Sequence, residues 1–392
     1  MKFAHLSDCH IGGWHEYNLR SLNLKSFQKA IELSINEHVD FILISGDLFD
    51  TSLPSIDVLK ETAFILKNLS NLNIPVYLIP GSHDFSVSGK TMLDVLENAG
   101  LVVNVMKFED DKLKFTIDNK TNIYLSGFYG KKGSLEHSEY VDLVKSHLEF
   151  NTNKKIFLFH SLIKDIKPNY FENVEGISIS ALPKGFDYYA GGHPHFVYGQ
   201  HHEDYGFIAY PGPIFPNNFD ELEKLKHGGF FIVNFDDKIE AKHIALDIVK
   251  VVSYNFNADN KTPQKLEQEL LSSIKDFENN IITIRIEGVL ESGKTSDINF
   301  KLLNERFKSA YCILKNTYKL KSKEFDDLEI DTRSVNDIEA SLIKSSLVQS
   351  KFSEVIINNL VSYLDKERFE GEKISDFELR IFSDIKKLFE ID

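Results

Sequence analysis

Residues 41–50 read FILISGDLFD, an apolar run that ends in Gly-Asp. Phe41–Ile44 is apolar without interruption, which is the pattern of a strand buried on both faces of a sheet. We therefore predict a strand at Asp40–Ser45. Asp47 follows where this strand ends, and in an open α/β sheet such strand ends are where sites form.

Similar apolar runs recur along the first part of the chain and alternate with amphipathic stretches. We predict strands at Phe3–Ser7, Asp40–Ser45, Val76–Pro80, Ile123–Gly127, Lys155–His160, Tyr188–Gly191, Phe207–Tyr210 and Phe230–Phe235. We predict helices at Leu24–Asn36, Ser55–Leu69, Thr91–Asn98 and Glu139–Leu148. Helices separate the early strands and hairpin-like spacings separate the later ones, which indicates an α/β fold of layered sheets between helices.

The pattern changes near residue 246, so we predict a first domain at 1–245. A small α+β module is predicted at 246–320, with strands at Val251–Phe256, Ile281–Glu287 and Tyr311–Asn316 and helices at Gln264–Phe277 and Asn299–Ser309. Residues 321–392 are predicted to be a charged linker followed by helices, because Phe352, Ile356 and Leu360 recur at helical spacing.

The composition is that of an ordinary soluble chain of two or three domains, with 392 residues of which 42% are hydrophobic. Cys9 and Cys312 are too few for a disulfide framework, and no signal peptide or membrane span is apparent, so we predict a cytoplasmic protein. The net charge of −14 argues against nucleic-acid binding over the whole surface. It does not exclude a local site whose positive charge comes from metal ions.

Residues of metal-binding type follow five of the predicted strands or end them. They are Asp8, His10, Asp47, His83, Asp84, His160, His193 and His195. Each of these alone is also compatible with a turn aspartate or a surface histidine. Together and in this order they predict a metal site at one edge of the sheet. Carboxylate and imidazole ligands without thiolate suit Mn²⁺, Fe²⁺ or Zn²⁺.

The order and spacing of these residues resemble the five motifs of the calcineurin-like metallophosphoesterases. The resemblance implies a four-layer αββα sandwich and two divalent metal ions about 4 Å apart, which hold a phosphate ester and activate a water. It implies that one ion is bound by Asp8, His10, Asp47 and His195. The other ion would be bound by Asp47, Ser82, His160 and His193, so that Asp47 bridges the pair.

Ser82 departs from the Gly-Asn-His pattern of that family, in which the asparagine carbonyl binds the second ion. A serine hydroxyl is shorter and is a poorer ligand, so either a water fills the gap or the second ion binds more weakly. We expect the metal pair to persist with lower occupancy or an altered metal preference. The resemblance also implies that His83 stabilises or protonates the leaving oxygen and that Asp84 orients the other ring nitrogen of His83.

A more specific resemblance lies in FAHLSDCHIG at residues 3–12, YNL at 17–19 and SGDLFD at 45–50. These stretches are similar to the SbcD-type DNA repair exonucleases and their archaeal and eukaryotic meiotic-recombination-eleven counterparts. The resemblance extends over essentially the whole chain. It implies exonucleolytic and endonucleolytic cleavage of DNA phosphodiesters at double-strand breaks, with Mn²⁺ as the metal, in the cytoplasm of a prokaryote at the nucleoid.

The same resemblance implies partners besides DNA. Residues 246–320 correspond to a capping, DNA-binding domain, and residues 335–392 to a segment that docks on a Rad-fifty- or SbcC-type coiled-coil ATPase. Helices near 55–69 and 91–98 would form a homodimer. Two other interpretations stay open: a small-molecule phosphodiesterase or phosphatase with the same cluster, and a weakly active DNA-end-binding scaffold in which Ser82 has impaired the site.

Overall fold

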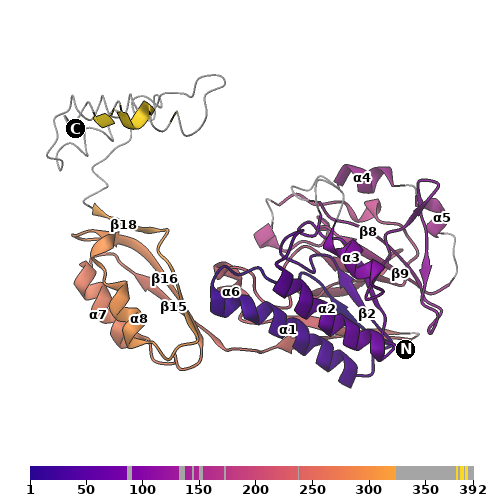
Figure 1. Ribbon diagram of the computed structural model, residues 1–392, viewed down its shortest axis with the longest axis horizontal. Helices are drawn as coiled ribbons and strands as arrows, with labels where there is room; N and C mark the ends of the chain where they lie inside the picture. Colours follow the sequence, from indigo (N-terminus) through magenta and orange to yellow (C-terminus); the bar gives the residue numbers. More distant parts are fainter. Residues whose placement is uncertain are drawn as a thin grey trace.

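The structure is a computed structural model that describes residues 1–85, 91–131, 137–143, 145–149, 153–171, 174–236, 238–323, 377, 380–383 and 385–386. Up to Leu246 the described chain forms two six-stranded sheets with helices (Figure 1). From Val251 onward it forms a separate four-stranded sheet that carries its own helices. Most of the tail predicted at 321–392 lies outside the described residues.

The first sheet is built around the buried strand that FILIS forms. Its order is β14 (Ile239–Leu246), β13 (Gly228–Phe235), β1 (Lys2–Leu6), β2 (Phe41–Ser45), β3 (Val76–Ile79) and β4 (Val103–Asn104). Strands β1 to β4 are parallel to one another. On the other side of β1, β13 pairs antiparallel with β1 and β14 pairs antiparallel with β13. The ends of β1, β2 and β3 therefore point to the same edge.

The second sheet has a parallel centre as well. Its order is β11 (Tyr198–His202), β12 (Gly206–Tyr210), β10 (Tyr188–Gly192), β9 (Lys155–His160), β8 (Tyr124–Phe128) and β7 (Thr116–Ile117). Strands β8, β9, β10 and β12 are parallel, and His160 at the end of β9 pairs with Gly192 at the end of β10. A short hairpin of β5 (Phe108–Glu109) and β6 (Lys112–Leu113) lies outside both sheets.

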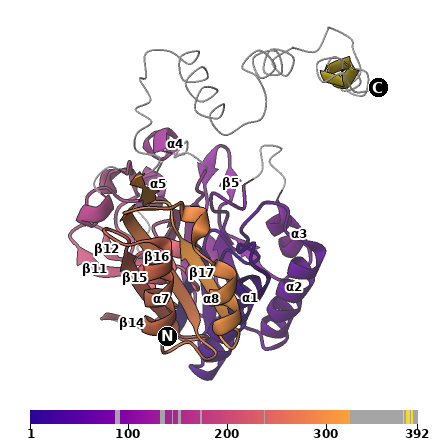
Figure 2. The same cartoon turned by 90° about the vertical axis from the view of Figure 1, so that its left-hand side faces the viewer.

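Three hydrophobic clusters stack these elements in layers. The middle cluster joins the sheets through side chains such as Phe3 and Leu43 from the first and Ile156 and Tyr188 from the second. The outer face of the first sheet is covered by α1 (Tyr17–Asn36), α2 (Ile56–Asn71) and α3 (Met92–Asn98) (Figures 1 and 2). Helices α4 (His137–Asp142) and α5 (Ser146–Glu149) pack on the second. This arrangement confirms the predicted α/β fold of sheets between helices.

The four-stranded sheet comprises β15 (Val251–Asn257), β16 (Ile281–Leu290), β17 (Cys312–Asn316) and β18 (Leu320–Ser322). Helices α7 (Pro263–Ser273) and α8 (Phe300–Arg306) bury one face in a cluster of their own. The sheet meets the N-terminal part at α6 (Phe219–Leu225), whose Leu222 is buried together with Val251 and Ile281. The 3-10 helices in the described part of the chain are Asn169–Phe171, Ile179–Ala181 and Thr295–Asp297.

Some predicted boundaries were wrong for identifiable reasons. Helix α1 begins at Tyr17 rather than Leu24, and its N-cap Glu16 makes no side-chain capping bond that would mark the start. The helix expected at Glu139–Leu148 is two short helices, α4 and α5. Lys321 and Ser322, expected in a linker, pair with β16 as part of β18. The described tail residues 377, 380–383 and 385–386 are helical, in agreement with the helices predicted toward the end of residues 321–392.

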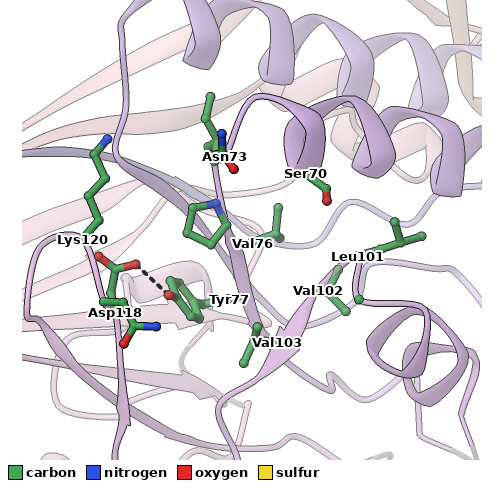
Figure 3. A pocket seen from close by; sticks show the side chains of 13 residues that line it. Ser70, Asn73, Val76, Tyr77, Leu101, Val102, Val103, Asp118 and Lys120 are labelled. Carbon is green, nitrogen blue, oxygen red and sulfur yellow. Dashed lines mark hydrogen bonds between the residues drawn. The ribbon is translucent and has the colours of Figure 1, made fainter.

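Two further observations concern membrane-spanning helices and a surface pocket. In the part of the chain that is described, no helix has the length and apolar character needed to cross a membrane. A pocket of about 400 Å³ is lined by Val76, Tyr77 and Leu101, with a hydrogen bond of 2.7 Å between the Tyr77 hydroxyl and Asp118 (Figure 3). It lies at the start of β3, whereas the predicted metal ligands follow the end of that strand.

Candidate metal centre

The predicted ligands meet where the parallel strands of both sheets end. They are Asp8 and His10 after β1, Asp47 after β2, Ser82 after β3, His160 at the end of β9, and His193 and His195 after β10. All are buried or half-buried, and Asp8 and His160 have no exposed surface. Two sheets therefore bring polar side chains together at one place.

One group of ligand atoms consists of Asp8, His10 and His195. The Nε2 atoms of His10 and His195 lie 3.3 Å apart, and His195 Nε2 lies 3.7 Å from Asp8 Oδ1. Asp47 borders this group, because its Oδ2 lies 3.7 Å from His10 Nε2. These four residues are the set predicted for one ion.

A second group consists of Asp8, Asp47 and His160, with His160 Nε2 at 3.2 Å from Asp47 Oδ2. Ser82 adjoins it, and its hydroxyl donates to Asp47 Oδ2 over 3.3 Å. His193 contributes no atom to either group, although its ring centroid lies 5.2 Å from that of His160. Asp47 is a member of the second group and borders the first, which is the position that a bridging carboxylate would need.

The backbone is strained at several of these residues. Positive φ angles occur at Asp8 (50°), His10 (42°), Asp47 (51°) and His193 (93°), a region that side chains other than glycine rarely adopt. Each such residue costs on the order of 1–3 kcal/mol and persists only where the surrounding structure fixes it. Positive φ angles also occur at described non-glycine residues far from the ligands, such as His38 and Asn73, so the strained backbone accompanies the site without identifying it.

Glycines leave the room that these side chains occupy. A Cβ on Gly46, whose φ is +88°, would lie 2.2 Å from His160 Nδ1. A Cβ on Gly81 would lie 2.2 Å from Asp47 Oδ1 and 2.3 Å from the Asp47 nitrogen. The Gly-Asp and Gly-x-His motifs therefore need glycine so that two strand ends can approach each other.

Three histidines have an oxygen atom beside Nδ1, and for His160 and His195 this oxygen is a hydrogen-bond partner. His160 Nδ1 lies 2.8 Å from the carbonyl oxygen of Ser45, which can only accept, so Nδ1 carries the proton. His195 Nδ1 lies 2.9 Å from Glu221, and His10 Nδ1 lies 3.2 Å from Asp50. Partners of this kind leave Nε2 as the ligand atom, which is how metal-binding histidines are commonly held.

The charges favour a divalent cation. Burial alone would raise the pKa of Asp47, but His160 and His10 hold it well below its ordinary value. Burial lowers the pKa of His160 and the charge of Asp47 more than compensates, so that it reaches about 10. Burial lowers the pKa of His193 to about 4, helped by His160. A cation bound here would displace the proton of His160, so metal binding and proton release are coupled.

The residues present fit a metal pair. Among the described residues, His160 Nε2 is a buried nitrogen with no hydrogen-bond donor or acceptor, and it faces the Asp47 carboxylate. The ligand atoms within each of the two groups lie within 4.8 Å of one another. Imidazole and carboxylate donors without thiolate suit Mn²⁺, Fe²⁺ or Zn²⁺.

Comparison with known proteins agrees with this geometry. Residues 1–197 match the family model described as calcineurin-like phosphoesterase, which is half of the chain. The chain belongs to the calcineurin-like phosphoesterase family. This membership confirms the prediction of a metal-dependent phosphodiester hydrolase.

Similarity to individual members of the family extends further along the chain. The DNA double-strand break repair protein Mre11 of Sulfolobus acidocaldarius is 27% identical over 392 residues, which cover 94% of this chain and 97% of that protein. Its counterpart from Methanocaldococcus jannaschii is 27% identical over 381 residues, which cover 95% and 96%. These matches confirm the predicted resemblance to the SbcD-type and meiotic-recombination-eleven nucleases.

One role predicted from the calcineurin-like phosphoesterase pattern was wrong. The Asp84 carboxylate accepts from the backbone nitrogens of Gly81, Leu48 and Phe49 over 3.1–3.2 Å, and the ring nitrogen of His83 that it was expected to orient is bonded to Asp50. Burial and the charge of Asp47 raise the pKa of this carboxyl to about 7. A buried acceptor held by three N–H groups fixes the two loops together, which is a structural role.

The partner of His83 is Asp50 instead. His83 Nδ1 lies 2.7 Å from the Asp50 carbonyl oxygen and 3.7 Å from its Oδ1. The backbone nitrogen of His83 donates to Asp47 Oδ1 over 2.7 Å. The protonated Nδ1 leaves Nε2 of this partly exposed ring available to substrate.

Two residues that orient the ligands in this phosphoesterase were not identified from the sequence. Asp50 could have been identified, because it is the last residue of the GDLFD stretch and a second aspartate three positions after Asp47. Glu221 could not have been identified, because its helix has the charged sequence of an exposed helix and is far along the chain from every motif.

Proposed function

We propose that the chain is a Mn²⁺-dependent nuclease that cleaves DNA at double-strand breaks. The observation that supports DNA as the substrate is the extent of the similarity to Mre11 proteins, which continues over 94–95% of the chain. It runs through the four-stranded sheet at Val251–Ser322, which a phosphatase for small molecules has no need of. Residues 1–245 would be the nuclease domain and residues 246–320 the capping, DNA-binding domain.

The metal ligands divide into two sets in this proposal. One ion is bound by Asp8, His10, Asp47 and His195, and the other by Asp47, Ser82, His160 and His193. When bound, two divalent cations neutralise phosphate oxygens and lower the pKa of a water into the neutral range. The chain itself supplies Asp47 between them, which offsets the repulsion of the cations.

His83 acts on the leaving group. Its Nδ1 is fixed by the Asp50 carbonyl oxygen and its backbone by Asp47, so the ring stands beside His10 with a centroid distance of 4.7 Å. In the imidazolium form, which also carries a proton on Nε2, the ring would donate a hydrogen bond or that proton to the oxygen that leaves the phosphorus. Asp84 keeps the loop of His83 in place through its backbone contacts.

An aromatic pair beside the centre suits a nucleic-acid strand. Phe85 and Tyr129 stack with centroids 5.9 Å apart and ring planes 13° from parallel. Phe85 follows the His83 loop, and Gly130, next to Tyr129, leaves so little room that a Cβ would lie 2.4 Å from His160 Cδ2. Stacking on aromatic rings holds single strands without regard to sequence.

Cleavage of an oligonucleotide and of a small chromogenic phosphodiester, each with Mn²⁺, tests the substrate class. We expect cleavage of the oligonucleotide, and we expect Phe85→Leu to raise its KM roughly tenfold because a stacked base is lost. The control Phe85→Tyr keeps an aromatic ring and should retain the native KM. Activity on the chromogenic ester alone would instead support a small-molecule phosphodiesterase.

Ser82→Asn tests how the departure from the family pattern affects the second ion. An asparagine carbonyl reaches further than the hydroxyl that now bonds to Asp47, so we expect one Mn²⁺ to bind roughly tenfold more tightly. Ser82→Ala is the matched control and should bind Mn²⁺ no more tightly than the native chain. Equal affinity in the native chain and Ser82→Asn would contradict this account. Activity confined to Ser82→Asn would favour a DNA-end-binding scaffold.

The exposed apolar side chains of α2 suit a second copy of the chain. Ile56 and Phe64 are 83% and 65% exposed, and Val95 of α3 is 52% exposed. A hollow of about 680 Å³ lies beside Phe64 and is bordered by Ala63, Ala99 and Leu101. Figure 2 shows α2 and α3 on the same side of the molecule. The homodimer would therefore form through helices near 55–69 and 91–98.

Phe64→Glu tests this dimer. We expect the native chain to elute as a dimer in light-scattering chromatography and Phe64→Glu as a monomer, because a charge would be buried in the apolar contact. Val141, which is 70% exposed on α4, provides the control, and Val141→Glu should remain dimeric. A native monomer would contradict the proposed homodimer, and a dimer in both variants would place the contact elsewhere.

A coiled-coil ATPase of the Rad-fifty or SbcC type is the proposed further partner, docked on residues 335–392. That segment lies almost entirely outside the described residues. The support for it is the similarity to the two Mre11 proteins, which spans 94–95% of this chain.

A further inference from the structure

Helix α6 lies between the candidate metal centre and the four-stranded sheet. Figure 1 shows it on the side of the N-terminal part that faces β15 and β16, both of which it contacts. Glu221 on this helix bonds to His195, while Asp220 and Glu223 bond to Arg285 of β16. One short helix therefore carries contacts to both parts of the molecule.

The contacts of Arg285 are strong and partly shielded from water. Its Nε donates to Glu223 Oε2 over 2.8 Å and one terminal nitrogen donates to the same oxygen over 2.5 Å. The same terminal nitrogen donates to Asp220, and the guanidinium lies 5.2 Å from the centre of the Phe219 ring. The Arg285 and Glu223 side chains are only 22% and 13% exposed. Charge-assisted bonds in such a setting hold a fixed geometry.

The start of α6 is equally tightly joined to the metal centre. The Glu221 carboxylate accepts from the Asn217 nitrogen over 2.8 Å and from the Asn218 side chain over 2.5 Å, in addition to its bond with His195. Asn218 is the N-cap of the helix and accepts from the Glu221 nitrogen over 2.9 Å. These bonds fix the position of the Glu221 carboxylate relative to the first turn of α6.

A second connection leads from the same turn to another ligand. The Asn217 side chain donates to Asp50 Oδ1 over 3.2 Å, and that oxygen lies 3.2 Å from His10 Nδ1. His10 and His195 belong to the set proposed for one ion. His160, from the other set, is oriented by the Ser45 carbonyl at the end of β2, which has no bond to α6 among the described residues.

We propose that Arg285 is a positioning residue for one of the two metal ions. By holding α6, it fixes Glu221 and Asn217 and thereby aims His195 and His10 at the ion that these two histidines share. The placement of the four-stranded sheet then sets the affinity of that ion and leaves the other ion unaffected. This inference rests on the proposed division of the ligands into two sets.

Mn²⁺ titration of the full chain by calorimetry, with electron paramagnetic resonance of the bound ions, tests the inference. We expect Arg285→Gln to weaken one of two Mn²⁺ ions roughly tenfold and to leave the other unchanged, since loss of an outer contact to a ligand weakens metal binding by about 10–100-fold. Arg285→Lys keeps the charge without the forked contact and should be intermediate. Glu223→Gln removes the charge at the other end of the pair and should reproduce the selective loss.

Two controls distinguish a failure of the role proposed for Arg285 from a failure of the proposed metal assignment. Lys250→Gln breaks the ion pair with Asp276 at the edge of the same sheet and should change neither ion. His195→Ala should remove the ion that Arg285→Gln weakens. Two unchanged ions in Arg285→Gln and Glu223→Gln, or equal weakening of both ions, would overturn the role of Arg285. Two ions retained by His195→Ala would instead overturn the proposed metal assignment.

Discussion

His83→Ala is expected to slow phosphodiester cleavage by roughly 10²–10⁴-fold, the usual contribution of a positioned acid or base. Metal content should be unchanged, because neither proposed ligand set includes His83. The expected change is therefore confined to kcat, with the KM for DNA little altered. Cleavage rates and Mn²⁺ stoichiometry measured on the same preparation provide the test.

The competing interpretation of His83 is a metal ligand. Its ring also lies near His10 and Asp50, and these three residues could hold an ion of their own. The Nδ1 atoms of His10 and His83 lie 3.2 and 3.7 Å from Asp50 Oδ1, and His83 Nδ1 is already bonded to the Asp50 carbonyl oxygen. Loss of an ion from His83→Ala would show that ligation, rather than proton donation, is its role.

Gly81→Ala is expected to weaken both Mn²⁺ ions by about 100-fold, although it alters no ligand. The new Cβ would lie 2.2 Å from Asp47 Oδ1 and 2.3 Å from the Asp47 nitrogen, so Asp47 must move. Since Asp47 is proposed to bridge the ions, its displacement affects both. Cleavage should be lost in parallel with metal content.

Gly100→Ala is the control for this substitution. A Cβ at Gly100 would have no atom within 4 Å, so the substitution displaces no neighbour. The φ of +69° at Gly100 is unfavourable for alanine, so the substitution should lower only the stability of the fold. It should cost on the order of 1 kcal/mol of stability and leave Mn²⁺ binding as it is. Native metal affinity in Gly81→Ala would show that Asp47 is not the shared ligand.

The fold and the strand-end residues could be predicted from the sequence because local pattern determines them. The uninterrupted apolar run Phe41–Ile44 is typical of a strand buried on both faces of a sheet, and parallel strands bring their ends to one edge. The side chains that follow β1, β2 and β9 then have to approach each other. Asp8, Asp47 and His160 do form one group of ligand atoms.

The contacts that orient these ligands could not be predicted in the same way. The Glu221–His195 bond joins a helix with no motif to a strand end, and only the packing of α6 brings them together. Asp84 follows His83 in sequence, which suggested that their side chains interact. The carboxylate turns instead to three backbone nitrogens, because buried N–H groups of two loops need an acceptor.

The most direct test of the central claim is the number of Mn²⁺ ions bound per chain, measured for the native protein, His195→Ala and His160→Ala. We predict two ions in the native chain that are magnetically coupled through Asp47, and the loss of a different ion in each variant. A native chain without bound Mn²⁺, or with ions that both substitutions leave in place, would contradict a shared metal centre at these strand ends.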